Sequence, residues 1–143
     1  MKKLLLVSLL LFVYTCDKPD SNTDKTSKPE VTNSKGIGPI TSVTLGPIDP
    51  KRAENGEKIF QQKCSSCHKI TEKYVGPALK GATKRHSPEW IMNFVLNTEE
   101  MLQKDPKAIE LLETYMTKMI AQGLNEAEAR DVLEYLRKID EEK

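Results

Sequence analysis

The sequence contains few of the residues from which many functional sites are built. Three cysteines, two histidines and one tryptophan occur among its 143 residues. No stretch alternates apolar and polar residues as a half-buried strand would, and no segment repeats. The formal net charge is +1, which gives no support to nucleic acid or a strongly charged surface as a partner. We therefore expect one helical, monomeric domain with attachments that does not bind nucleic acid.

One short motif holds two of the three cysteines, because residues 64–68 read Cys-Ser-Ser-Cys-His. Cysteines three apart lie on one face of a helical turn, so each thiol can add to one of two neighbouring vinyl groups of a haem. The histidine that follows is placed to bind the iron. The motif predicts one covalently bound haem c, attached through Cys64 and Cys67, with His68 as the proximal ligand. Iron held in this way is commonly paired with a downstream methionine.

Two other kinds of site could use a pair of cysteines at this spacing. A zinc site would need two more ligands, and only Cys16 and His86 remain in the chain. A redox dithiol would need a βαβ pattern around it, which the sequence lacks. Both interpretations are therefore weaker than haem attachment.

The first sixteen residues have the pattern of an export signal. Two lysines precede a mainly apolar run over residues 4–14, which is too short to span a bilayer and suits a signal peptide. The run ends near Cys16, whose position resembles the lipid-modified cysteine of bacterial lipoproteins, although Thr15 stands where Gly, Ala or Ser is usual. We expect residues 1–16 to be the signal, with cleavage before a lipidated Cys16, and a lipid-anchored protein on the periplasmic side of a bacterial membrane. Ordinary cleavage and an uncleaved signal anchor stay open.

Residues 17–48 differ in composition from the rest of the chain. They are rich in polar residues, proline and glycine and have little to bury, which is typical of a flexible tether. Four apolar residues within 36–47 leave open whether that part lies against the domain, and no regular structure is expected there. The folded domain should span residues 49–143, a length at which a covalent haem helps to stabilise a small core.

Four helices are predicted in this domain from their caps and their apolar periodicity. Each begins at a residue that commonly caps a helix, and three have proline at the first helical position. They start at Asp49-Pro50, Ser87-Pro88, Asp105-Pro106 and Asn125, and the second and fourth run to about Leu96 and Ile139.

The first and last of these helices are expected to cross. A glycine inside a helix costs about 1 kcal/mol relative to alanine, so Gly56 makes sense only where another helix approaches closely. Phe60 follows one turn later on the same face. Their expected partners in the last helix are Val132, Tyr135 and Leu136.

Taken together, these features resemble a class I cytochrome c over residues 50–143. The resemblance rests on the haem motif, on a glycine and a phenylalanine before it and on a Gly-Pro turn after it. The segments that carry it are Gly56 to Phe60, residues 64–68, Gly76-Pro77-Ala78-Leu79-Lys80-Gly81, Ser87-Pro88-Glu89-Trp90-Ile91, Met119 and Glu134-Tyr135-Leu136. The family implies an all-α fold in which the terminal helices cross and the helices pack around one covalent haem c.

The resemblance also implies roles outside the haem motif. In that family a proline carbonyl accepts a hydrogen bond from the proximal histidine ring, so Pro77 is expected to orient His68. The family has its axial methionine on a loop before the last helix, often as Met-Pro-x-x-Gly-Leu. Residues 119–124 here read Met-Ile-Ala-Gln-Gly-Leu, which makes Met119 the expected distal iron ligand.

Four further residues have alternative interpretations. Arg85 and Trp90 are candidate donors to the haem propionates, with a surface charge and a core aromatic as the plainer roles. Met116 is expected in the core on the apolar face of its helix, and less so as the distal ligand. His86 is expected to be a solvated loop residue, because it follows two basic residues just before a capped helix.

Charge is divided along the domain. Residues 51–86 carry nine Lys or Arg against three acidic residues, whereas residues 87–143 carry seven against thirteen. A basic rim around the haem would steer acidic redox partners toward it. The plainer alternative is a solvated surface that partly balances the propionates.

The function implied is electron transport between membrane-associated respiratory complexes, and not catalysis. Iron ligated by both His68 and Met119 would have no open position for a substrate, and small size and export suit a shuttle. The expected partners are an electron-donor complex and a terminal oxidase or reductase. The alternative is a haem enzyme or gas sensor, such as a peroxidase or a nitric oxide binder, with a labile distal ligand. Ile120 in place of the family's usual proline is the one hint of it.

Overall fold

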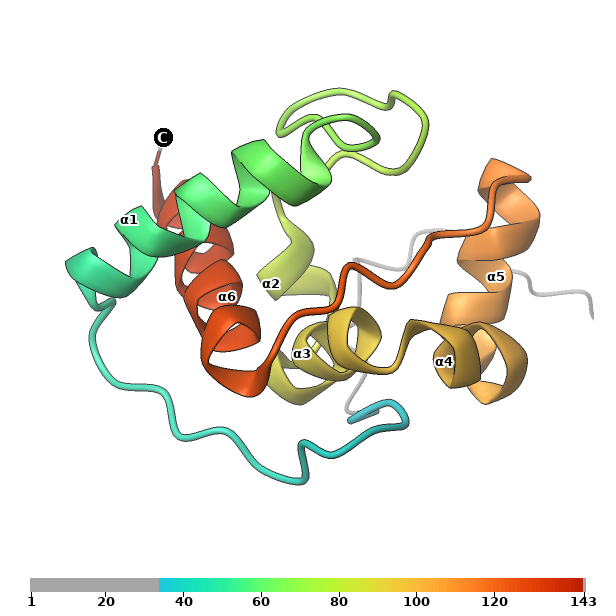
Figure 1. Cartoon of the computed structure of the whole chain (residues 1–143), viewed down its shortest axis with the longest axis horizontal. Helices are drawn as coiled ribbons and strands as arrows, with labels where there is room; N and C mark the ends of the chain where they lie inside the picture. The colour runs from blue at the N-terminus through green and yellow to red at the C-terminus, as the bar shows by residue number, and fades with distance from the viewer. Residues whose placement is uncertain (1–33, 143) are drawn as a thin grey trace, which may run out of the picture.

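The computed structural model describes residues 34–142, and this part of the chain is helical (Figure 1). Its elements in chain order are α1 (Pro50–Ile59), a one-turn π-helix η1 (Phe60–Cys64), α2 (Ala82–Arg85), α3 (Pro88–Leu96), α4 (Thr98–Lys104), α5 (Pro106–Tyr115) and α6 (Glu126–Glu141). No strand occurs among these described residues, so the expected all-α fold class is confirmed. Within residues 34–142, none of the helices is both long enough and apolar enough to cross a membrane.

The four predicted helices begin at the predicted capping residues. Asp49 and Asp105 each accept hydrogen bonds from two backbone N–H groups in the first turn of α1 and α5. Ser87 accepts one at the start of α3. At α6, Asn125 and Glu128 form a reciprocal capping box. Because these side chains satisfy N–H groups that have no partner within the helix, each helix starts at a defined residue.

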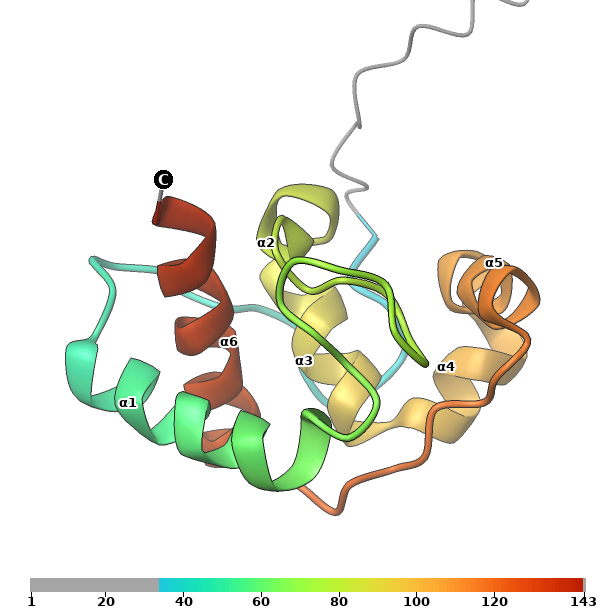
Figure 2. The ribbon, with the colours of Figure 1, turned by 90° about the horizontal axis from the view of Figure 1, so that it is seen from above.

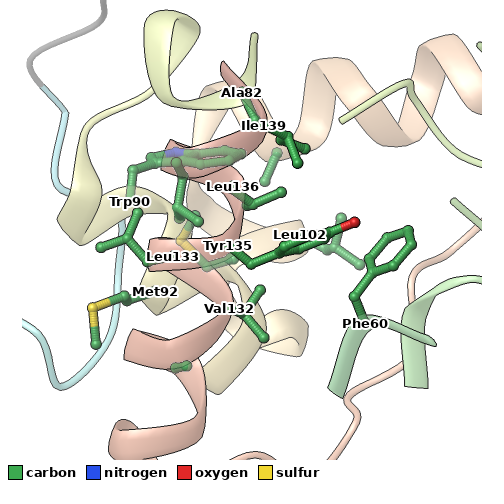
Figure 3. Packing of buried hydrophobic residues seen from close by; sticks show 14 residues of the cluster. Phe60, Ala82, Trp90, Met92, Leu102, Val132, Leu133, Tyr135, Leu136 and Ile139 are labelled. Atoms are coloured by element: carbon green, nitrogen blue, oxygen red, sulfur yellow. The ribbon is translucent and has the colours of Figure 1, made fainter. Parts of the chain in front are cut away.

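Helices α1 and α6 cross at Gly56, where their backbones come together. A Cβ atom at Gly56 would overlap the carbonyl oxygen of Asp131 and lie 2.9 Å from the Cβ of Tyr135. One turn further on, the ring of Phe60 packs against that of Tyr135, with centroids 5.5 Å apart (Figure 3). The predicted crossing of the terminal helices is therefore present, with the glycine at the closest approach.

Helix α6 packs against α1, α2 and α3 (Figure 2), and it carries two buried carboxylates with different partners. The buried Asp140 accepts hydrogen bonds from the backbone N–H of Gly81 and from both the N–H and the hydroxyl of Thr83. These bonds fix the start of α2. The fully buried Glu134 is paired with two arginines of its own helix, which compensates for the removal of its charge from water.

Residues 34–48 lie along the domain as an irregular segment, which we call the N-terminal strap (Figure 1). The side chain of Asn93, which is buried in α3, accepts a hydrogen bond from the N–H of Ile40 and donates to two carbonyl oxygens of the strap. Arginines of α6 donate to two more carbonyl oxygens, those of Thr44 and Gly46. The strap is therefore held by side chains of both α3 and α6.

The N-terminal strap shows that residues ahead of the expected Asp49, from Ser34 on, pack on the domain. It has no regular structure, as expected, and it lies against the domain, which the sequence leaves open for residues 36–47 of the predicted tether. The predicted signal and residues 17–33 lie outside the described residues. Besides Ile40, two strap N–H groups bind side chains of the domain: Ile37 to Met101 Sδ at 2.9 Å and Val43 to Glu89 Oε1 at 2.8 Å.

The core differs from the sequence-based expectation in two places. The sequence does not predict α4, whose Met101 is completely buried. Met116 was expected in the core, but its side chain is 86% exposed. The reason is that α5 ends at Tyr115 and Met116 takes a left-handed conformation with φ 51°. The helical spacing that would place Met116 beside Leu112 therefore no longer applies.

Replacing Gly56 by alanine should destabilise the crossing of α1 and α6. The added Cβ meets a backbone oxygen, which no side-chain rotation can relieve, so the helices must separate. We expect the free energy of unfolding to fall by about 1–3 kcal/mol, despite the better helix propensity of alanine. Denaturant unfolding followed by circular dichroism measures this. Gly46→Ala is the control, because nothing lies within 4 Å of a Cβ there. Unchanged stability of the Gly56 variant would contradict the close approach.

Candidate functional site

The Cys-x-x-Cys-His motif follows α1 through a widened turn. In η1 the N–H of Ser65 bonds to the carbonyl of Phe60, five residues back, instead of four. The next turn closes on Cys64, whose carbonyl accepts hydrogen bonds from the N–H groups of Cys67 at 3.0 Å and His68 at 2.9 Å. Single π turns occur often at functional sites, where they redirect the side chains that follow. The motif is thus connected directly to the helix that packs on α6.

Two adjoining cavities of about 470 and 190 Å³ lie beside the motif. They share part of their walls, and the shared residues are Cys64, His68, Pro77, Phe94, Leu111, Tyr115 and Met119. These residues come from the motif, the loop after it, α3, α5 and the segment before α6. The larger volume lies within the roughly 300–1,000 Å³ that cofactor and ligand sites usually occupy.

The loop after the motif holds the ring of His68. Its Nδ1 lies 3.0 Å from the carbonyl oxygen of Pro77, which is the contact that the resemblance implies. If Nδ1 donates its proton to this carbonyl, Nε2 is left unprotonated and can bind a metal. Gly76 packs on the same ring, since a Cβ there would lie 2.5 Å from Cε1 of His68. The turn therefore restricts the imidazole both by a hydrogen bond and by close packing.

Met119 reaches the same cavities from a distant part of the sequence. It is half-buried in the segment between α5 and α6, which has no regular secondary structure. Met92 and Met101 are buried in the core, and Met116 is exposed. Among the methionines of residues 34–142, Met119 alone lines these cavities. The structure therefore brings the two expected iron ligands, His68 and Met119, to one space.

The two cysteines of the motif form no disulfide, and Cys64 is half-buried whereas Cys67 is exposed. Burial raises the pKa of the Cys64 thiol, and the positive charge of Lys63 opposes this only in part. A redox dithiol needs a thiol with a lowered pKa. Nor do three His, Cys, Asp or Glu side chains of residues 34–142 gather as a zinc site would require. Both alternatives to haem attachment are thereby weakened.

Comparison with known proteins agrees with this geometry. The family described as "Cytochrome c" matches residues 53–140, which is more than half of the chain. The chain belongs to the cytochrome c family. Its cofactor is accordingly a covalently bound haem c, and Cys64 and Cys67 are consistent with the attachment site.

Individual relatives are similar over different lengths. "Cytochrome c-553-like" from Synechocystis sp. (strain ATCC 27184 / PCC 6803 / Kazusa) is 37% identical over 62 residues, which is 41% of this chain and 59% of that relative. Cytochrome c from Rhodothermus marinus has 42% identity and a TM-score of 0.72, covering 74% of this chain and 92% of its own. An engineered Rhodothermus marinus cytochrome c bound to a carbene intermediate has 44% identity and a TM-score of 0.68, covering 73% and 91%. These similarities confirm the class I cytochrome c fold.

The cytochrome c cavities have the donor set that a haem needs. Two thiols stand three residues apart at the wall, an imidazole follows them, and a thioether lines the same space from another segment. Thiols that attach the porphyrin, with histidine and methionine as axial ligands, are the usual set for this cofactor. The remaining shared wall residues, Pro77, Phe94, Leu111 and Tyr115, suit its apolar macrocycle. The residues present therefore fit the group.

Arg85 and Trp90, the expected propionate donors, both line the larger cavity. The indole Nε1 of Trp90 already donates to the buried Asp105 carboxylate at 3.0 Å, and an indole has no other polar hydrogen. This bond favours the plainer role of Trp90 as a core aromatic, whose ring forms a wall of the cavity. Arg85 donates to the carbonyl oxygens of Lys80 and Ala78, which leaves other N–H groups of its guanidinium for a further partner.

His86 is not the solvated residue that the sequence predicts. Its ring is half-buried and stacks on Trp90, with centroids 3.9 Å apart and an interplanar angle of 12°. Its Nδ1 is buried and has no hydrogen-bond partner among the described residues. The neighbouring basic residues suggested an exposed loop. However, α3 begins only two residues later, at Pro88, and this brings the ring of His86 onto that helix.

Three wall residues of the haem site were not predicted as such. Phe94 stacks on Trp90 with centroids 4.9 Å apart, and Leu111 and Tyr115 of α5 line both cavities. Leu111 and Tyr115 are four apart, so a helical stripe was present in the sequence. Periodicity shows which residues avoid water, but it does not distinguish a face that packs on protein from one that packs on a cofactor.

The stability of the protein should depend on His86 at mildly acidic pH. Burial, assisted by the charges of Arg85 and Lys107, lowers the pKa of His86 to about 4, although Asp105 and Glu110 oppose the shift. An unfolded histidine titrates near 6.5, so as the pH falls the unfolded chain binds this proton first. Stability is therefore lost progressively between pH 6.5 and about 4, by about 1–2 kcal/mol when partial exposure is allowed for.

The test of the His86 prediction compares denaturant unfolding of the wild type and His86→Phe at pH 7 and about pH 4.5. Phenylalanine can keep the stack on Trp90 but cannot titrate. The wild type should lose more stability than the variant over this range. An NMR titration that gives His86 a pKa at or above 6.5 would contradict the expectation.

Proposed function

We propose that this cytochrome c carries single electrons, with Cys64 and Cys67 bonded to the haem as thioethers. His68 and Met119 then bind the iron from its proximal and distal sides. The observation that carries this proposal is that His68 and Met119 line the same two cavities, which also border Cys64. No other methionine of the described residues reaches them.

If both His68 and Met119 bind the haem iron, no position on the iron is left open for a substrate. This favours electron carriage over catalysis. Iron held by an imidazole and a thioether can change its charge by one electron without exchanging a ligand. The soft thioether favours reduced iron and raises the reduction potential. Pro77 would tune the reduction potential through the proximal ligand, because a hydrogen bond from Nδ1 of His68 to its carbonyl orients the imidazole and increases its basicity. One polypeptide thereby sets both the position and the potential of the haem.

The proposed partners are redox proteins with acidic docking faces. Lys63 and Lys118 line the smaller cavity, together with the exposed apolar side chains of Val75 and Ile120. A basic rim accelerates encounter with an acidic partner, and apolar side chains at its centre give a surface to bury. An electron-donor complex and a terminal oxidase or reductase, both associated with the membrane, fit these requirements.

A second candidate function, a haem enzyme or gas sensor, is favoured by one observation about the distal segment. Residues 117–124 make no backbone–backbone hydrogen bond to any other described residue. A ligand on such a segment can leave the iron at low structural cost, which would admit a peroxide or a small gas. One of the similar structures is an engineered cytochrome c that is bound to a carbene intermediate. Electron carriage requires Met119 bound most of the time, whereas this alternative requires frequent release.

Met119→Ala should open the distal side of the haem iron. The reduced variant should bind carbon monoxide readily, and its ferric form should lose the weak absorption band at the red end of the spectrum that marks methionine ligation. Carbon monoxide titration of the purified protein measures this. The wild type should keep that band and bind carbon monoxide poorly if electron carriage is its function. A wild type with high-spin ferric bands would favour the enzyme or sensor instead.

Met116→Ala is the matched control, because this methionine is three residues away and 86% exposed. It should neither open the iron nor change the free energy of unfolding by more than about 0.5 kcal/mol, as is usual for surface substitutions. If Met116→Ala opens the iron and Met119→Ala does not, the ligand assignment is wrong.

The proposed location is the periplasmic side of a bacterial membrane, with the protein anchored by a lipid on Cys16 after removal of the signal that precedes it. The apolar run and the cysteine after it support this, and both lie outside the described residues. Cys16→Ala should release the mature protein from membranes, because a lipid chain would be its anchor. Fractionation with immunoblotting measures the distribution. Membrane association that persists with an uncut N-terminus would show a signal anchor instead.

A further inference from the structure

We propose that Glu99 of α4 is a positioning residue for Met119, acting through Lys118 as a latch on the distal segment, residues 117–124. The carboxylate Oε1 of Glu99 lies 2.9 Å from Nζ of Lys118, the residue directly before Met119. The proposal rests on the assignment of Met119 as the distal iron ligand. It adds a residue outside the haem cavities that controls how long this ligand stays in place.

The distal segment is poorly secured by its own backbone. Helix α5 ends at Tyr115, and Met116 turns the chain with a positive φ of 51°. Near the other end, Gly123 has φ 63° and open space around its Cβ position. No backbone–backbone hydrogen bond joins residues 117–124 to the rest of the described chain. Because it has a turn at each end, we call the distal segment a flap (Figure 1).

Two lysines connect this flap to the rest of the domain. Lys118, on the flap, pairs with Glu99, while Lys63 donates from η1 to the carbonyl oxygen of Gln122 at 3.2 Å. Each lysine directly precedes a residue of the haem site, Met119 in one case and Cys64 in the other. The other fastening is apolar packing of Met119 and Leu124 against the core. Because the flap has so few contacts, losing either lysine contact should make its displacement from the domain easier.

Of the two lysine contacts, the Glu99–Lys118 pair is the one whose strength should depend on the salt concentration. Its side chains are 69% and 56% exposed, so water and salt screen it. Exposed pairs of this kind change an equilibrium by about 1.5- to 5-fold. If an external ligand binds only when Met119 has left the iron, its apparent affinity follows the fraction of open molecules. Loss of Glu99 should therefore strengthen binding of an external ligand by that factor.

The test uses ferric, haem-loaded protein and imidazole, which is uncharged at about pH 8.5 and so does not respond directly to a surface charge. Glu99→Gln should lower the apparent dissociation constant for imidazole about 1.5- to 5-fold at about 10 mM salt. At about 1 M salt the difference from the wild type should disappear, because the pair is screened in both. Glu100→Gln is the matched control, since Glu100 pairs with Lys104 within α4 and leaves the flap untouched.

An exchanged pair distinguishes a latch from a general effect of charge. The double variant Glu99→Lys with Lys118→Glu should recover the affinity of the wild type, whereas either single reversal should bind imidazole more tightly. Equal affinities of Glu99→Gln and wild type at low salt would overturn the latch, as would equal effects of Glu99→Gln and Glu100→Gln. Met119→Ala separates the two proposals. If it fails to strengthen imidazole binding, the ligand assignment fails; if only the Glu99 variants fail, the latch alone is wrong.

Discussion

The close approach of α1 to α6 at Gly56 is the constraint on which the rest of the structure depends. With this crossing fixed, η1 continues from α1 and places the haem motif next to the core. Helix α6 then fixes the other side of the site, because Asp140 binds the N–H groups at the start of α2. Two of the elements that border the haem cavities, η1 and α2, are thus positioned by one helix pair.

The two proposed ligands of the iron are held in unequal ways. His68 is restricted by a hydrogen bond and by the packing of Gly76, both within a loop that is bonded back to the motif through Gly76 N–H and the carbonyl of Cys67. Met119 sits in a segment that relies on side chains alone. With the proposed ligation, such an arrangement would make the proximal ligand permanent and the distal one exchangeable. Small changes in the distal segment could therefore alter function without disturbing haem attachment.

Much of the fold and of the site could be predicted because their signals are local. A cap followed by proline marks a helix start within three residues, and the haem motif spans five. Predictions failed where the outcome depends on how a ring packs on a neighbouring helix or on the residue at which a helix ends. His86 is half-buried because its ring stacks on Trp90 of the next helix, and Met116 is exposed because α5 ends one residue earlier. Short α4 has few apolar residues, so periodicity could not reveal it.

For the N-terminal strap the sequence could only leave attachment open, since most of its polar contacts to the domain use backbone groups that every sequence possesses. This has a practical consequence for truncation. A chain cut at Asp49 would leave the amide of Asn93, which is 1% exposed, without the strap groups that it now binds. It would also remove the acceptors of two arginines on α6. A portion of this protein chosen for fusion or transplantation should therefore include the strap together with the helices.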